Sequence, residues 1–128
     1  MESNMGRSDL LTSFKYAFAG VWHILQTQRN ARIHVCLALV AVVLGLWLGL
    51  SRTEWAVITL TIGLVLVAEA FNTVAESAID LVTREYHPLA RIAKDVAAGA
   101  VLLAAMTAVV VGLLILGPPL WRALVAVF

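Results

Sequence analysis

Acidic and amide side chains recur at helical spacing directly after an apolar run, at Glu69, Asn72, Glu76 and Asp80. At about 100° per residue, the four fall within a stripe about 80° wide on one helix face. A carboxylate inside an apolar membrane helix costs roughly 3 kcal/mol or more, and three on one face repel each other unless cations lie between them. A helix that simply emerges into solvent would explain Asp80, but not Glu69 and Asn72, which continue the apolar run. The stripe therefore predicts a functional site that binds cations.

A second charged group opens the next apolar helix, at His87, Arg91, Lys94 and Asp95. Arg91, Lys94 and Asp95 share one face at spacings i, i+3 and i+4, and small side chains follow at 96–100 and permit close helix approach. A Lys–Asp pair that only marks the membrane edge is the alternative, but this pair directly abuts the apolar run. Carboxylates that can hold divalent cations, facing a lysine and an arginine, suit the binding of a nucleoside triphosphate with magnesium.

The elements that must position these side chains are membrane helices. Hydrophobic residues make up 62% of the 128 positions and charged residues 13%, and residues 35–50, 55–68 and 96–121 carry no charge. Such runs, with little polar surface to cover them, predict an all-α membrane protein rather than a soluble core. We expect a single domain over 1–128 with a surface helix at 8–28 and membrane helices at 31–50, 53–83 and 88–117.

Local signals support these boundaries. Residues 14–25 place aromatic and apolar side chains on one helical face, which favours a helix lying in the membrane interface over one packed on the bundle. Ser51 and Glu54 fit a capping box at the start of the second membrane helix, so Glu54 is expected to be structural. Pro88 suits the first turn of the third, and Gly117-Pro118-Pro119 is expected to end or bend it.

The distribution of basic residues predicts the orientation. With the N-terminus in the cytoplasm, three crossings leave Arg52 and Arg122 outside and the other seven of the nine Lys and Arg residues inside. This asymmetry fits the positive-inside bias, so the acidic stripe is expected at the cytoplasmic face. The net charge of +1 gives no indication of a nucleic-acid partner.

Two blocks resemble a known family. Residues 69–80 match Glu-x-x-Asn-[Ser/Thr]-x-x-Glu-x-x-x-Asp, which is similar to the signature of the prokaryotic diacylglycerol kinase and undecaprenol kinase family. Tyr86-His87, followed by Ala93-Lys94-Asp95 and residues 98–101, is similar to its second block. The resemblance extends from about residue 14 to about residue 121.

The resemblance implies a homotrimeric enzyme of the bacterial inner (plasma) membrane, with composite active sites that use ATP and Mg²⁺ to phosphorylate the primary hydroxyl of a lipid alcohol. Glu69 would be the general base, Asn72 would steady the site and Glu76 would hold magnesium on the phosphates. The residues implied to contact the nucleotide are Tyr16, Glu76, Glu85, Tyr86, His87, Lys94 and Asp95.

One position departs from the family. Gln28 stands where the family usually has a metal-binding glutamate, and an amide oxygen is a weaker ligand for a hard cation. Gln28 is thus expected either to complete a weak metal site or to lie in solvent at a helix end.

The lipid is left open. Residues 28–34 resemble the Glu-Arg-Asn-x-Arg-x-His run of the undecaprenol-kinase branch, so both diacylglycerol and undecaprenol remain candidate substrates. The alternative from another class is a small oligomeric transporter or channel subunit, since charges within membrane helices also mark ion pathways.

Overall fold

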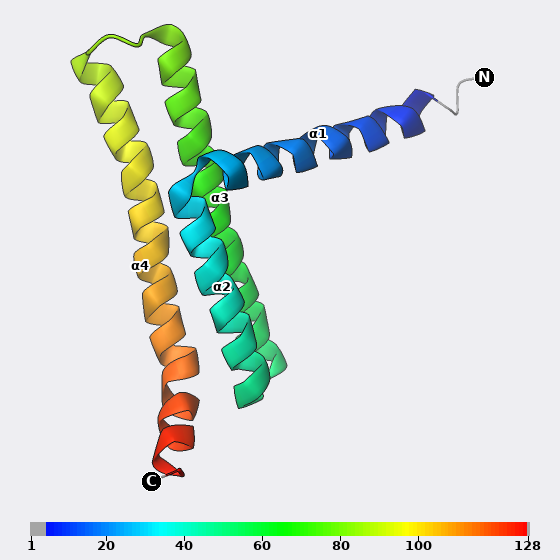
Figure 1. Ribbon diagram of the computed structural model, residues 1–128, viewed down its shortest axis with the longest axis vertical. Coiled ribbons are helices and arrows are strands. Elements are labelled where there is room, and N and C mark those ends of the chain that lie inside the picture. Colours follow the sequence, from blue (N-terminus) through cyan, green and yellow to red (C-terminus); the bar gives the residue numbers. More distant parts are fainter. Residues whose placement is uncertain (1–4, 128) are drawn as a thin grey trace.

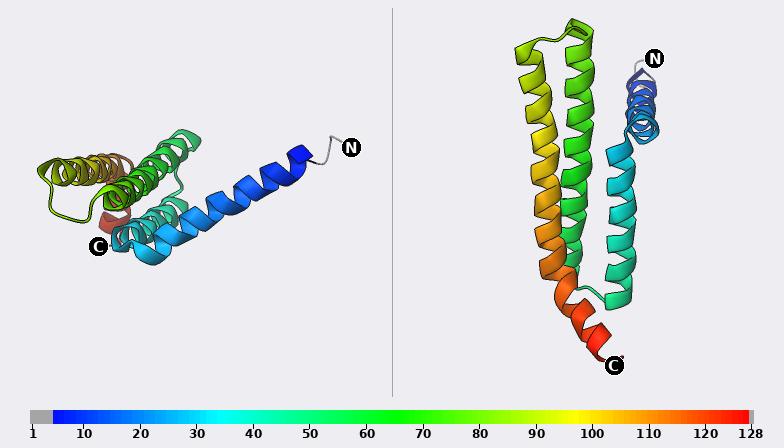
Figure 2. Two further views of the ribbon diagram at one scale, coloured as in Figure 1. Left: turned by 90° about the horizontal axis from the view of Figure 1, so that it is seen from above. Right: turned by 60° about the vertical axis from the view of Figure 1, so that its left-hand side comes forward.

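The computed structural model describes residues 5–127, and these form four helices and no strand. The helices are α1 (Met5–Thr27), α2 (Arg29–Leu48), α3 (Arg52–Val82) and α4 (Pro88–Val125). Helices α2, α3 and α4 pack side by side, with α3 antiparallel to the other two, whereas α1 leaves the bundle at a steep angle (Figure 1; Figure 2). The predicted all-α architecture of one surface helix and three long helices is confirmed.

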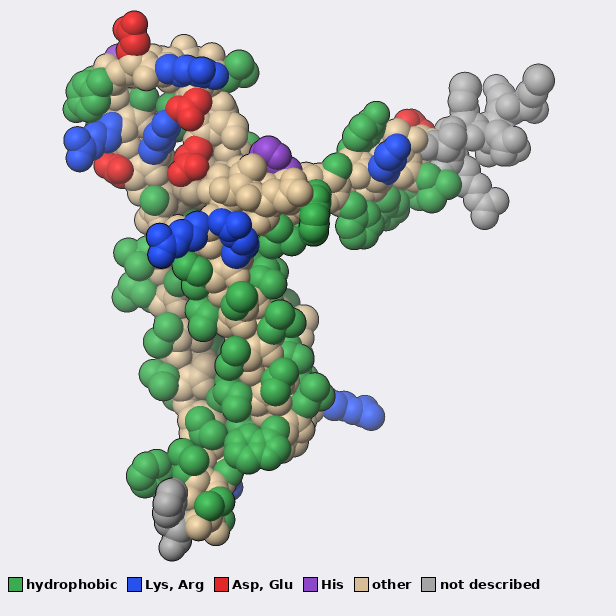
Figure 3. Space-filling model, in the orientation of Figure 1, with side chains coloured by type: hydrophobic (Ala, Val, Ile, Leu, Met, Phe, Trp, Pro, Cys, Tyr) green, Lys and Arg blue, Asp and Glu red, His purple; other side chains and the backbone are tan. Residues whose placement is uncertain are grey.

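Helices α2, α3 and α4 are each long and apolar enough to cross a membrane, with mean hydropathies of 2.2, 1.9 and 2.7. Most large apolar side chains face outward, and the buried apolar core consists of Ala31, Ile58, Val65, Val101 and Ala104. Figure 3 shows the same division, with an apolar bundle surface and charged side chains gathered where α3 and α4 are joined. An apolar surface of this extent indicates a protein that is solvated by lipid.

The turn between α2 and α3 has the predicted capping box. The backbone N–H of Ser51 donates to Glu54 Oε2 at 2.7 Å, and the backbone N–H of Glu54 donates to Ser51 Oγ at 3.3 Å. These two bonds satisfy amides that the first turn of α3 would otherwise leave without a partner. Glu54 is therefore a structural residue, as expected.

Helix α4 continues through Gly117-Pro118-Pro119 to Val125 and does not end near residue 117. The prolines cannot donate to the carbonyls one turn earlier, and the helix bends in this region instead of stopping (Figure 2). Continuation is favoured in an apolar environment, because a chain that leaves the helix there exposes backbone groups that nothing else can satisfy.

Helix α1 places its aromatic face outside the bundle. Phe14, Phe18 and Trp22 are exposed by 56%, 71% and 61%, and the helix extends away from the start of α2 (Figure 1). Such an exposed apolar face on a helix roughly perpendicular to the bundle suits a helix lying in the membrane interface. The junction of α1 and α2 then marks the level of that interface.

Gly45 allows the α2–α3 turn to close tightly, and Gly45→Ala tests this packing. A Cβ at Gly45 would lie 2.9 Å from both Leu50 Cδ1 and the Trp55 ring, so we expect destabilisation of about 1–3 kcal/mol. Thermal unfolding in detergent measures it, with Gly20→Ala as the control because a Cβ there meets nothing within 4 Å. Equal midpoints for the two variants would contradict this packing.

Candidate functional site

Glu69 is the most deeply buried acidic side chain that the structure describes. It lies on α3 and is 2% exposed. Its Oε1 is 3.2 Å from Nε2 of His34, which lies in the second turn of α2. The two groups are close enough for an ion pair when His34 is protonated, but their orientation does not make a hydrogen bond, and Glu69 Oε1 has no hydrogen-bond donor.

His34 is a site residue that the sequence did not reveal as one. The sequence placed it only in a run that resembles one branch of the family. The available signal is that His34 shares a helical face with Ala31, Ala38 and Ala41. A lone histidine on such a face is consistent with a polar partner on a neighbouring helix, but it does not identify that partner.

The remaining polar residues of the stripe continue along α3 from Glu69 toward solvent. The Asn72 amide donates to Glu76 Oε1 at 3.2 Å, while Asn72 Oδ1 is buried without a hydrogen-bond partner. The side chain of Asp80, about 16 Å farther along the helix axis than Glu69, is 51% exposed. The stripe thus forms a polar ladder (Glu69, Asn72, Glu76, Asp80) that becomes progressively more accessible to water.

The cations of α4 face this ladder at its outer end. Lys94 Nζ lies 2.5 Å from Asp80 Oδ1 and joins α4 to α3, and Arg91 Nε lies 3.7 Å from Asp95 Oδ2 on its own helix. Both pairs are at least one third exposed, so each contributes at most about 1 kcal/mol to stability.

The α3–α4 loop lies beyond the ladder, at the same end of the bundle (Figure 1). Glu85, Tyr86 and His87 are all exposed. His87 Nδ1 accepts the backbone N–H of Leu89 at 3.2 Å, and the backbone N–H of Glu85 donates to Thr83 Oγ1 at 3.2 Å. These contacts order the loop and leave the Tyr86 ring, 77% exposed, available to a ligand.

Within the described chain, no hydrogen bond or ion pair joins the side chain of Tyr16 or Gln28 to the ladder. Tyr16 is 71% exposed on α1, which extends away from α3 and α4. Gln28 is half-buried at the α1–α2 junction, where it is the N-cap residue of α2 but makes no side-chain capping bond.

The oxygen ligands of the ladder fit a magnesium–nucleotide complex better than a bare ion. Across residues 5–127, no group of three or more His, Cys, Asp or Glu side chains is close enough to hold a metal. The unpartnered Asn72 Oδ1 and the Glu76 carboxylate are nevertheless the oxygen donors that Mg²⁺ prefers, and phosphates supply the other ligands in such sites.

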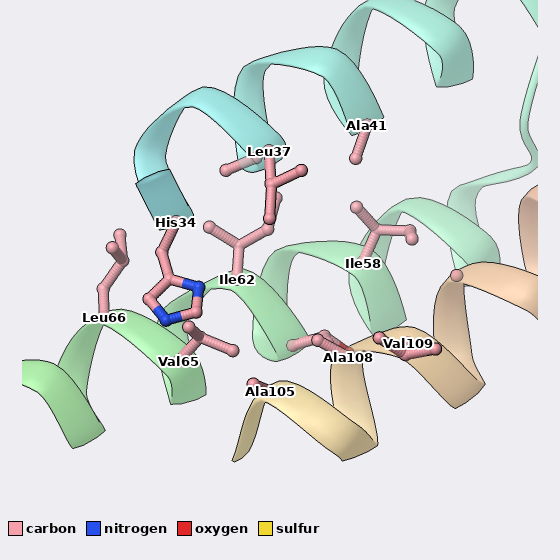
Figure 4. Close-up of a pocket in the computed structure, with 13 residues that line it drawn as sticks. His34, Leu37, Ala41, Ile58, Ile62, Val65, Leu66, Ala105, Ala108 and Val109 are labelled. Carbon is pink, nitrogen blue, oxygen red and sulfur yellow. The ribbon is translucent and has the colours of Figure 1, made fainter. Parts of the chain in front are cut away.

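An apolar cavity of about 260 Å³ lies between α2, α3 and α4. Its walls include Leu37, Ile58, Val65 and Val109, and His34 lines one end (Figure 4). The cavity lies within the three apolar helices, so it is suited to hydrocarbon rather than to water. His34 therefore lies between an apolar cavity and the buried carboxylate of Glu69.

Comparison with known proteins agrees with this arrangement. A Synechocystis protein named diacylglycerol kinase is 50% identical over 113 residues, which are 88% of this chain and 65% of that protein. The undecaprenol kinase of Bacillus subtilis is 40% identical over 94% of this chain and its own full length. The Escherichia coli K12 diacylglycerol kinase is 35% identical over 72 residues, 56% of this chain and 59% of that protein. The chain thus spans slightly less than two thirds of the Synechocystis protein and all of the Bacillus one.

None of these matches supports the transporter or channel alternative. The family model described as prokaryotic diacylglycerol kinase matches residues 15–116, a range that contains the polar ladder, the loop and the start of α4. The resemblance inferred from the two sequence blocks is confirmed, and the chain belongs to the prokaryotic diacylglycerol kinase family.

Proposed function

We propose that this protein transfers the terminal phosphate of ATP to the primary hydroxyl of a membrane lipid alcohol. The observation that carries the proposal is the position of Glu69. Its carboxylate is buried, has an oxygen without a hydrogen-bond donor, and contacts His34, which lines an apolar cavity within the membrane helices. A lipid hydroxyl arriving from the membrane and a phosphate arriving from water can meet there.

Glu69 acts in this reaction as the general base. It accepts the proton of the lipid hydroxyl while the hydroxyl oxygen forms a bond to the γ-phosphorus, and the bond from that phosphorus to the β-phosphate oxygen breaks so that ADP leaves with the electron pair. Because phosphoryl transfer depends mainly on positioning and charge neutralisation, a base and a few charged groups are sufficient.

The other side chains of the ladder hold the donor. Asn72 and Glu76 would present oxygens to Mg²⁺, and the bound ion would neutralise the charge that develops on the phosphates. Lys94 can exchange Asp80 for a phosphate oxygen, and Asp95, Glu85, Tyr86 and His87 surround the solvent end where the nucleoside would lie.

A homotrimer with composite sites is part of the proposal. It is supported by the course of α1, which carries Tyr16 and extends away from the bundle, and by the buried oxygens that the described part of this chain leaves without partners. The bias of basic residues supports a cytoplasmic ladder, which is the side where ATP is available.

Either diacylglycerol or undecaprenol fits the cavity chemistry, and relatives of both names match the chain. Purified protein with ATP, magnesium and each lipid in separate vesicles distinguishes them by the relative kcat/KM. Activity on neither lipid, nor on other long-chain primary alcohols, would reject the proposed function.

Glu69→Gln should remove turnover while leaving the fold and the oligomer nearly intact, because an amide keeps the shape but cannot accept the proton. The loss expected for a general base is about 100-fold or more. Phosphate transfer from labelled ATP measures it, and gel filtration in detergent checks assembly. The control is Glu54→Gln, since glutamine can still complete the capping box. Activity of Glu69→Gln within tenfold of the parent would show that Glu69 is not the base.

Gln28→Glu should tighten magnesium binding if Gln28 faces the metal, because a charged carboxylate oxygen replaces a neutral amide oxygen. We expect the half-saturating magnesium concentration to fall, most clearly at low ATP. A magnesium titration of the kinase rate at two ATP concentrations measures this shift. Superimposable titrations for parent and variant would show that Gln28 is not part of the metal site. A sharp loss of activity would show that a fourth carboxylate repels the three acids of the ladder too strongly.

A further inference from the structure

Among the side chains that the structure describes, those of residues 9–127, His34 alone is an ion-pair partner of the Glu69 carboxylate. The two side chains are 18% and 3% exposed, and their nearest polar atoms, His34 Nε2 and Glu69 Oε1, are 3.2 Å apart. They come from different helices, α2 and α3, so their approach depends on how the bundle packs rather than on local sequence.

The neighbouring polar side chains of the ladder and of Thr73 bond to groups other than the Glu69 carboxylate. The Thr73 hydroxyl donates to the backbone carbonyl of Glu69 at 3.0 Å and not to its carboxylate. The Asn72 amide donates to Glu76, and Lys94 pairs with Asp80. An ionised carboxylate that is buried without a donor or a cation costs several kcal/mol, so His34 is the group of this chain that can compensate it.

We infer that His34 is a positioning residue that holds the Glu69 carboxylate at the end of the apolar cavity, ready to accept the proton of the lipid hydroxyl. The inference rests on the proposed function. A rotation of the imidazole ring turns the 3.2 Å contact into an N–H···O bond that restrains the carboxylate and stabilises its ionised form. His34 also lines the cavity (Figure 4), so the lipid hydroxyl approaches Glu69 past this ring.

This role requires a hydrogen-bond donor at position 34. A side chain there must donate one hydrogen bond across the α2–α3 contact, but it need not carry charge or bind substrate. Glutamine has a similar reach and an N–H donor, whereas leucine fills similar space and has no donor. Comparing the two substitutions therefore separates the effect of the hydrogen-bond donor from the effect of side-chain packing.

His34→Leu should lower kcat by about 10- to 100-fold, as expected for the loss of a charge-assisted hydrogen bond, with the KM for ATP within about twofold of the parent. His34→Gln should restore kcat to within about threefold of the parent. The control is His23→Leu, which removes an exposed histidine of α1 and should leave kcat unchanged. Full activity of His34→Leu, or equal loss in the Leu and Gln variants, would overturn the inference.

A stability cycle tests the same contact without relying on turnover. Thermal midpoints in detergent are compared for the parent, His34→Leu, Glu69→Gln and the double variant. If the two side chains interact, the shifts in thermal midpoint should not be additive. Once one partner has been changed, changing the other no longer breaks the contact. Additive shifts would overturn the inference. A parent that phosphorylates no lipid alcohol would instead reject the proposed function, while the cycle would still report whether His34 and Glu69 interact.

Discussion

Burying the Glu69 carboxylate inside an apolar helix bundle costs several kcal/mol unless neighbouring groups compensate it, and the other features of the site follow from this cost. We infer that the compensation comes from outside α3, since Thr73 bonds only to the backbone. His34 of α2 lies 3.2 Å from the carboxylate, and Ala31, one turn earlier on α2, is small and 2% exposed. A bulkier side chain at Ala31 would separate the imidazole from the carboxylate.

The length of α3 connects this buried group to water. Its 31 residues span about 46 Å, well beyond a hydrocarbon core of about 30 Å, so the helix must project from the membrane. Apolar side chains occupy the inner part, and the polar ladder begins near the level where α1 leaves the bundle. One continuous helix thus carries both the proposed base, Glu69, and the proposed magnesium ligands, Asn72 and Glu76. The spacing between them is set by helical geometry and does not depend on a flexible loop.

Local features of the chain were predictable because they depend on short spacings. The helical period places Glu69, Asn72 and Glu76 on one face, and the Asn72–Glu76 hydrogen bond confirms that they are neighbours. The capping box was predictable for the same reason. The course of α4 beyond Pro118 was harder to predict. In water, prolines normally end a helix, whereas an apolar environment favours its continuation.

The contact between His34 and Glu69 could not be predicted from either helix alone. It depends on the rotation of α2 relative to α3, which is set by the packing of several small side chains along both helices. The roles proposed for Tyr16 and Gln28 stay predictions, since no hydrogen bond or ion pair in the described chain joins either side chain to the ladder. Sequence spacing therefore predicts which acids share the ladder, whereas the packing of α2 against α3 brings His34 beside the most buried of them.

The central claim is that a phosphate acceptor reaches Glu69 from the membrane while the donor arrives from water. The most direct measurement compares phosphate transfer from labelled ATP to two acceptors with the same primary hydroxyl, a long-chain lipid alcohol dissolved in vesicles and water-soluble glycerol, using the purified protein in those vesicles. We expect rapid transfer to the lipid and little to glycerol even at high concentration. Transfer to glycerol as efficient as transfer to the lipid, or no transfer to either, would contradict a site reached through the bilayer.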